Sequence, residues 1–381
     1  MNEIENICKS AALLARAEER CWLGTIVRVR GSAYRRPGAR ILFTREQACA
    51  GCISAGCVEA ELVRSGSFHA NTDACICTYE ASRPDDEEPD AIGSGCGGNM
   101  DVLVEPVTGG CHEALTFIEA ALSQQQRLAL VTVIHSDSPT CKLGARVARA
   151  GNRSFSTGCT LELESELELM AKEALEAPST RTRYVRRGAV ELLLEVLQPS
   201  PRLFVFGAGT DVLPLVTYAA GLGWDITVVS GHDRPSERAR FALVCRYVVC
   251  SAEAAVRSLN RSVRGLAVVM AHDYNADQRA LAALLDSRAR YIGVLGPLAR
   301  TQRMLIDIEK AGGSTLGALA RIHAPVGLNI GAETPAEIAL AIVAEAQAAL
   351  RRADAHALRD KPAIHDTLLP DHRGTAPEAA E

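Results

Sequence analysis

The chain has 381 residues, 48% of them hydrophobic and 23% charged, and its mean hydropathy is +0.04. These values are typical of a globular protein and exclude a disordered or fibrous chain, while the length predicts two domains of ordinary size. A net charge of -5 excludes the broad basic field that most nucleic-acid binders use, so we expect no nucleic-acid partner.

The start of the chain and its cysteines indicate the compartment. MNEIENICKS lacks the basic and then apolar order of a secretory signal, and no apolar run approaches the roughly 20 residues of a membrane span. We therefore expect a cytoplasmic protein without a membrane partner. Its thirteen cysteines are then expected to be mainly thiols. Eleven of them precede residue 160, so the two halves of the chain differ in chemistry.

Helices and strands mix in the first half of the chain. Apolar residues recur at helical spacing in 5–20, and TIVRVR at 25–30 alternates as a half-buried strand does. MDVLVEPV and LALVTVI read as strands on either side of a helix, and the acidic stretch 82–90 reads as a solvated loop. The pattern predicts a cysteine-rich α+β domain over residues 1–160.

The segment after residue 160 is ambiguous. LELESELEL (161–169) alternates like a strand but consists of good helix formers. We assign residues 161–198 to a connection between domains, residues 199–350 to the second domain, and residues 351–381, which have little apolar periodicity, to a tail.

The second domain alternates strands and helices. LFVFGAG, DITVVS, RYVVC, AVVMAHD and RYIGVLG are apolar runs of the kind that buried parallel strands have, separated by helical segments. This order predicts a Rossmann-like doubly wound parallel sheet, and so an α/β protein as a whole. A last helix is indicated by Thr334 at its N-cap, Pro335 at its first position and Glu337 three residues after the cap.

Glycines and polar residues follow the predicted parallel strands, at the edge where such sheets bind ligands. Gly207 and Gly209 follow the first strand, but Val212 stands where a dinucleotide fingerprint has its third glycine. A nucleotide loop and a merely tight turn therefore both remain open. The other candidates at this edge are Asp233, His272, Asp273 and Gly296.

Each polar residue of this edge also has a plain structural explanation. Asp273 can belong to a turn before a helix that Asn275 caps, and His272 can make one satisfied hydrogen bond. We favour these explanations for each residue alone, though not for the set.

Two glycine-rich cysteine segments stand out in the first domain. GCISAGCVE (51–59) contains Cys52 and Cys57, and GSGCGG (93–98) contains Cys96. Together with Cys49, Cys75 and Cys77 these thiols could suggest a metal site, but their spacing matches neither paired zinc knuckles nor a thioredoxin-type pair and argues against one, so we assign no metal ligand. Glycine beside a thiol lets backbone N–H groups and sulfur approach one flat or anionic ligand.

Arginines precede the first of these segments. In GSAYRRPGAR, Arg35, Arg36 and Arg40 have the planar guanidinium groups that clamp a phosphate through two hydrogen bonds. A solvated basic face is the alternative. With the thiols, the arginines favour a phosphorylated, sulfur-reactive ligand.

These motifs together resemble the xanthine dehydrogenase accessory family, XdhC/CoxI-like. The resemblance rests on GSAYRRPGAR, GCISAGCVE and GCGG in the first domain, then on FGAG, HDYNAD, YIGVLGP and HAPVGLNIGAETPAEIALAIVAE in the second. It covers nearly the whole chain, in the order of the family.

The resemblance implies an accessory protein that binds and protects molybdenum cofactor, a phosphorylated pterin dithiolene (molybdopterin). It further implies support of cofactor sulfuration and insertion into a molybdenum hydroxylase client of the xanthine dehydrogenase type, with a cysteine desulfurase as sulfur donor. By position, the implied cofactor-binding residues of the first domain are Cys57 and Cys96, then Cys52, where members often have Ser, together with Arg35, Arg36, Glu59, Gly97 and Gly98.

In the second domain the chain departs from the family pattern. Thr210 and Asp211 follow the GAG turn where many members have His and Val, and Ser230 replaces a frequent Asp. These departures put a nucleotide in this domain in doubt.

An NAD(P)-dependent oxidoreductase is the alternative function. The incomplete glycine fingerprint and Ser230, where an acid would hold the ribose, argue against it, and no proton donor pairs with a substrate arginine. We assign no catalytic residue and favour a non-catalytic cofactor-binding chaperone. The sequence leaves the oligomeric state open, a homodimer included.

Overall fold

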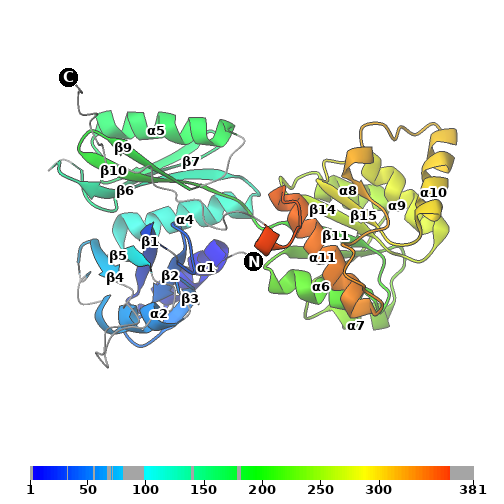
Figure 1. Ribbon diagram of the computed structural model, residues 1–381, viewed down its shortest axis with the longest axis horizontal. Coiled ribbons are helices and arrows are strands. Elements are labelled where there is room, and N and C mark those ends of the chain that lie inside the picture. Colours follow the sequence, from blue (N-terminus) through cyan, green and yellow to red (C-terminus); the bar gives the residue numbers. More distant parts are fainter. Residues whose placement is uncertain are drawn as a thin grey trace, which may run out of the picture. The chain divides into compact units, whose positions relative to one another are not determined.

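The structure, a computed structural model, describes residues 3–31, 33–54, 56–66, 70, 72–79, 98–138, 141–177 and 182–360. The chain divides into two compact units, which comprise mainly Glu3–Gln198 and Pro199–Ala357 (Figure 1). Each unit has hydrophobic cores of its own, and each is described by itself.

Two five-stranded antiparallel sheets form the first unit. The first sheet has the order β3-β2-β1-β5-β4, with β1 (Trp22–Arg30), β2 (Arg40–Phe43), β3 (Ala48–Gly51), β4 (Cys75–Tyr79) and β5 (Asn99–Pro106). The second has the order β8-β7-β6-β10-β9, with β6 (Leu128–Ser136), β7 (Arg146–Ala150), β8 (Arg153–Thr157), β9 (Arg183–Arg187) and β10 (Val190–Leu197).

Helices cover both sheets of the first unit. α1 (Glu3–Arg16) and α4 (Gly109–Ser123) share one core with residues of both sheets, and Figure 1 shows α4 between them. α5 (Leu161–Glu176) packs on the outer face of the second sheet. The short α2 (Cys57–Glu61) and the π-helical turn η1 (Leu62–Gly66) pack on the outer face of the first.

The expectation that residues 161–198 connect two domains is wrong. They form α5, β9 and β10, and β10 pairs with a strand on each side. LELESELEL is helical because its buried contacts recur at helical rather than alternating spacing: Leu167 is buried with Ala171 and Ala174, whereas Leu161 and Leu169 are exposed. The strands β5 and β6 stand before and after α4 in the chain, as predicted.

The two sheets of the first unit repeat one pattern. In each, a helix precedes three strands, a helical segment follows, and two more strands complete the sheet in the same spatial order. The registers agree: Thr25 lies opposite Arg40 as Thr132 lies opposite Arg146. A register shift at residue 27 in β1 has its counterpart at residue 134 in β6. We call residues 3–106 the first copy and residues 109–197 the second copy.

Superposing these registers reveals a trace of the repeat in the sequence. Gly-Ala-Arg recurs at 38–40 and 144–146. Gly38 and Gly144 both have positive φ, at +95° and +79°, and in both copies the glycine carbonyl accepts a hydrogen bond from the arginine two residues later. The first unit is thus an internal pseudo-dimer.

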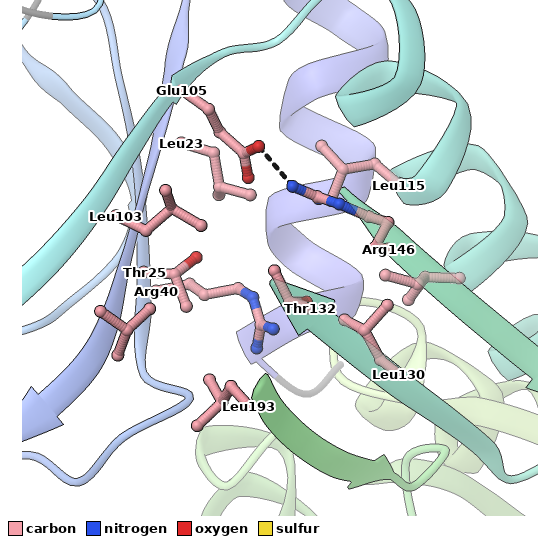
Figure 2. Close-up of a pocket in the computed structure, with 12 residues that line it drawn as sticks. Leu23, Thr25, Arg40, Leu103, Glu105, Leu115, Leu130, Thr132, Arg146 and Leu193 are labelled. Atoms are coloured by element: carbon pink, nitrogen blue, oxygen red, sulfur yellow. Dashed lines mark hydrogen bonds and ion pairs between the residues drawn. The ribbon is translucent and has the colours of Figure 1, made fainter. Parts of the chain in front are cut away.

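Reciprocal buried ion pairs join the copies. Arg40 of the first copy contacts Glu195 of the second, with Nη2 2.5 Å from Oε2, and Arg146 of the second contacts Glu105 of the first. All four side chains are at most 7% exposed. Between them lies a cavity of about 10 Å³, room for roughly one water. Figure 2 shows Thr25 and Thr132, which occupy equivalent positions of the two copies, at its wall.

Six parallel strands form the sheet of the second unit, in the order β13-β12-β11-β14-β15-β16. This is the doubly wound Rossmann order, as predicted. The strands are β11 (Arg202–Phe206), β12 (Asp225–Ser230), β13 (Arg246–Val249), β14 (Gly265–Val269), β15 (Tyr291–Val294) and β16 (Ile322–His323).

Helices pack on both faces of this sheet. α6 (Val212–Gly221), α7 (Pro235–Phe241) and α11 (Pro335–Arg351) contribute to one core, and α8 (Ala252–Leu259), α9 (Tyr274–Leu285) and α10 (Leu298–Lys310) to the other. Two 3-10 turns, η2 (Leu319–Arg321) and η3 (Leu358–Asp360), follow α10 and α11 respectively. α11 begins with the capping box that Thr334 and Glu337 predicted. In the described ranges, no helix has the length and apolar character to cross a membrane.

Candidate functional site

The glycine-cysteine loop of the first copy joins β3 to α2. Gly51 ends β3 with φ +82°, and a Cβ there would lie 2.2 Å from the Arg40 carbonyl oxygen. Gly56 precedes α2 with φ +128°. The loop therefore needs glycine at both ends, because a side chain would be strained at either position and would collide with β2 at the first.

Glu59 organises this loop from inside. Its carboxylate accepts hydrogen bonds from the backbone N–H groups of Ile53 at 3.0 Å, Ser54 at 2.6 Å and Gly56 at 3.0 Å, and from the Ser54 hydroxyl. Burial favours the neutral carboxyl, but these hydrogen bonds outweigh it and lower the pKa of Glu59 below its usual value. The arrangement makes Glu59 a residue that shapes the loop, with both oxygens already engaged.

Cys52 lies between two carboxylates. Its backbone N–H donates to Glu3 Oε1 at 3.1 Å, and its Sγ lies 3.4 Å from Glu59 Oε1 and 2.8 Å from the Ser54 carbonyl oxygen. Burial raises the pKa of the Cys52 thiol, and its hydrogen bond to Glu59 raises it further. Cys52 is therefore a neutral thiol near pH 7 and a poor nucleophile.

The three arginines before the loop have different surroundings. Arg35 forms an ion pair with Glu3, which connects it to Cys52 through the Glu3 carboxylate. Arg36 is exposed at the same turn. Arg40, expected to share in clamping a phosphate, is instead buried and bound to Glu195 at the interface between the copies. Its guanidinium is thus structural.

The remaining candidates of the first domain are placed only in part. The Cys57 side chain, Cys96 and Gly97 lie outside the described residues, so their expected common pocket stays a prediction. Gly98 is half-buried immediately before β5. In the described ranges, no three His, Cys, Asp or Glu side chains gather in a way that could hold a metal ion.

A cavity of about 280 Å³ lies elsewhere in the first unit. Its wall includes Arg28 and Arg30, which both donate to Asp101 Oδ2 at 3.2 Å, and His135. Arg28 also pairs with Glu191, so both guanidinium groups of this wall are already engaged by carboxylates. Arg28 and Arg30 were not among the candidates from the sequence, although their alternation in RVR on β1 places both on one face.

The glycine turn of the second unit lies at the switch point between β11 and β14, where doubly wound sheets bind ligands. Gly207, with φ +133°, packs so closely that a Cβ would lie 2.4 Å from the Met270 carbonyl oxygen. Gly209 follows, half-buried. The turn thus brings the loops after β11 and β14 together.

An acid-histidine pair lies against this turn. His272 Nε2 is 2.7 Å from Asp211 Oδ2, and His272 has φ +58°, which is unusual for a side chain of its size. A Cβ on Gly209 would lie 2.4 Å from Asp211 Oδ1. The Asp211 carboxylate therefore lies where a Rossmann fold places an anionic pyrophosphate.

The other candidates of this edge are engaged locally. Asp273 itself caps α9, accepting from the Ala276 N–H at 2.7 Å, so the expectation that Asn275 is the cap is wrong. Asp233 pairs with Arg238 at 2.9 Å in an exposed position. Gly296 follows β15 with φ +121°, a backbone conformation that favours glycine.

The fold and these sites define a two-domain α/β protein with antiparallel sheets in its N-terminal part and a Rossmann domain in its C-terminal part. A family model described as the XdhC Rossmann domain matches residues 203–346, and the model of the XdhC and CoxI family matches residues 14–67. The chain belongs to the XdhC and CoxI family, which points to an accessory role associated with xanthine dehydrogenase.

Relatives and solved structures agree with this assignment. The chain is 28% identical over 329 residues to a probable xanthine dehydrogenase subunit from Bacillus subtilis (strain 168), across 86% of this chain and 92% of that protein. It is 33% identical over 159 residues to the uncharacterized protein YqeB of Escherichia coli (strain K12), across 42% and 29% of the two. The crystal structure of a xanthine dehydrogenase from Bacillus halodurans has a TM-score of 0.72 and 25% identity, across 95% and 98% of the two chains.

Proposed function

We propose that the protein binds and protects molybdenum cofactor in its first domain and supports its sulfuration and insertion into a molybdenum hydroxylase of the xanthine dehydrogenase type. The client enzyme and a cysteine desulfurase are the partners of this role. The observation that carries the proposal is the loop from Gly51 to Glu59, which lies in the region that the family model matches and in which Cys52 is bound to the same carboxylate as Arg35, that of Glu3.

The comparison of the two copies supports a functional role for this loop. Counted from the shared Gly-Ala-Arg, the positions of Arg35 and Arg36 correspond to Cys141 and Lys142 in the second copy. The second copy folds without this pair of arginines, so the fold does not require it.

The donor set of the first domain fits a phosphorylated dithiolene. Arg35 and Arg36 would hold the phosphate, and the thiols of Cys57 and Cys96 would face the sulfur-bearing end. The cofactor itself supplies the metal and sulfur chemistry. Glu59 keeps the loop open by holding its N–H groups, and Cys52, a neutral thiol, packs without competing as a nucleophile.

A hydride-transferring oxidoreductase is less well supported by the second domain. The glycine turn and strand order of a dinucleotide site are present, but the Asp211 carboxylate repels a pyrophosphate there. We therefore propose that this domain takes no NAD(P) in a catalytic role, and a nucleotide would bind only weakly.

The proposal is tested by cofactor retention. The full chain, co-produced with the cofactor and purified anaerobically, is analysed for molybdenum and for pterin fluorescence. We expect both in the wild type and a large loss of both in Arg36→Ala and in Cys57→Ala/Cys96→Ala. Cys159→Ser is the control, because it removes a half-buried thiol of the second copy that is not among the proposed cofactor-binding residues. Equal retention in the double variant and the wild type would overturn the proposed cofactor site.

A further inference from the structure

Two cysteines outside the proposed cofactor site lie side by side on an edge strand. Cys75 and Cys77 alternate on β4, so both side chains point to the same face of the first sheet. Their Sγ atoms are 3.9 Å apart, and both residues are half-buried against the core beneath α2 and η1. No disulfide joins them.

The fold does not need thiols at these positions. Ile76 lies opposite Leu103 in the first copy, as Tyr184 lies opposite Leu193 in the second. The second-copy counterparts of Cys75 and Cys77 are therefore Arg183 and Val185. An arginine and an apolar residue serve equally well on β9, so packing alone does not explain a pair of thiols on β4.

A thiolate is the form of cysteine that binds metals, and binding of a metal ion displaces the thiol protons.

The spacing of the two sulfurs matches a metal chelate. In a tetrahedral zinc site with Zn–S bonds of about 2.3 Å, two sulfurs lie roughly 3.8 Å apart. We propose that Cys75 and Cys77 form a two-thiolate binding site for a thiophilic metal ion of the zinc class. Two thiolates neutralise the charge of a divalent ion, and partial burial limits competition by water.

The pair supplies two of the four ligands of a tetrahedral zinc-class ion. Within the described ranges, no third His, Cys, Asp or Glu side chain joins the pair. The site stands apart from the cofactor proposal, since it needs neither the pterin nor the loop at Gly51.

The test is a cadmium titration of the full chain after removal of bound metal under anaerobic conditions. Cd²⁺ is a zinc-class probe whose thiolate complexes absorb in the ultraviolet, and Zn²⁺ competition against a chromophoric chelator gives the affinity. We compare the wild type with Cys75→Ser/Cys77→Ser. The control is Cys245→Ser/Cys250→Ser, which removes the same number of half-buried thiols from the other unit.

We expect the wild type and the control to bind one ion per chain more than Cys75→Ser/Cys77→Ser. Loss of one sulfur should weaken this site by more than ~100-fold, beyond the ~10–100-fold that an outer-shell partner contributes. Cys77→Val, which introduces the residue of the second copy, keeps the packing and serves if the serine variants misfold by circular dichroism. The proposal is overturned if Cys77→Val binds cadmium with the number and affinity of the wild type.

Discussion

Breaking one of the reciprocal ion pairs tests the pseudo-dimer of the first unit. Arg40 and Glu195 are 7% and 4% exposed in their side chains and are joined by two hydrogen bonds, at 3.1 and 2.5 Å. In Arg40→Met the Glu195 carboxylate stays buried without a partner, and the Gly38 carbonyl oxygen loses its donor. Removing one partner of a buried pair destabilises a protein by about 3–5 kcal/mol.

Replacing both partners should recover much of this loss. Arg40→Met/Glu195→Leu fills the interface with apolar side chains of similar size, a change that is often neutral for buried ion pairs. We expect the double variant to be more stable than Arg40→Met by about 2 kcal/mol or more, given couplings of ~0.5–3 kcal/mol between contacting residues. Arg187→Ala, which breaks the exposed pair with Glu166, should cost at most ~0.5 kcal/mol.

Tryptophan fluorescence can follow this unit alone. The chain has two tryptophans, and Trp22 is fully buried in the first unit. In a Trp224→Phe background, urea unfolding of the first unit is read from Trp22. With m of about 2 kcal/mol per molar urea, a loss of 4 kcal/mol lowers the midpoint by roughly 2 M. A shift below ~0.5 M in Arg40→Met, or a double variant no more stable than Arg40→Met, would refute the reasoning.

Three further predictions concern the Gly51–Glu59 loop of the first unit and the Rossmann domain. Glu59→Gln should cost about 1–2 kcal/mol at pH 7, since hydrogen bonds to a charged group are lost. Because the folded pKa of Glu59 is depressed, this contribution is present above its unfolded pKa and is lost as pH falls through the folded value, so urea midpoints of Glu59→Gln and wild type should converge at low pH. Asp211→Val should raise the affinity for NADH or AMP by ~5–100-fold in a fluorescence titration, because a carboxylate no longer opposes the phosphate; unchanged affinity would contradict the electrostatic argument. The wild-type chain should show no steady NAD(P) turnover with common alcohols, acids or aldehydes, which a spectrophotometric assay decides.

The second unit could be predicted from the sequence because its strands are continuous apolar runs. Such runs have one interpretation when helices alternate with them, and the capping box at Thr334 fixed the start of α11. The hydrogen bond between His272 and Asp211 could not be predicted from the sequence. The two residues are 61 positions apart, and the loops after β11 and β14 that carry them come together only in the folded sheet.

The architecture of the first unit was harder to predict from the sequence. The two copies share few identities beyond Gly-Ala-Arg, so the repeat appears only when strand registers are compared. Without knowledge of the repeat, Arg40 is interpreted as one more arginine of a basic turn, although it is one partner of a buried ion pair. The same lack of long-range information placed residues 161–198 outside a sheet to which they contribute two strands.

Some candidate residues could be identified from local sequence alone, whereas the roles of others depend on contacts that the local sequence does not show. The glycine-cysteine motif marked the loop correctly because glycine is required by backbone geometry at Gly51. The hydrogen bond of Glu59 with the Gly56 N–H follows the N-cap to N3 spacing of a capping box, but its hydrogen bonds with Ser54, five residues earlier, follow no such spacing. The facing of Cys75 and Cys77 follows from strand alternation once β4 is recognised as a strand.

Activation of a client enzyme tests the central claim most directly. An apo-hydroxylase of the xanthine dehydrogenase type is incubated anaerobically with molybdenum cofactor, a cysteine desulfurase and either this chain or its Cys57→Ala/Cys96→Ala variant, and substrate hydroxylation is measured. The account predicts that the wild-type chain raises the activated fraction well above the sample without it, and that the variant, folded by circular dichroism, does not. Equal activation by the variant and the wild type, or none by either, would contradict it.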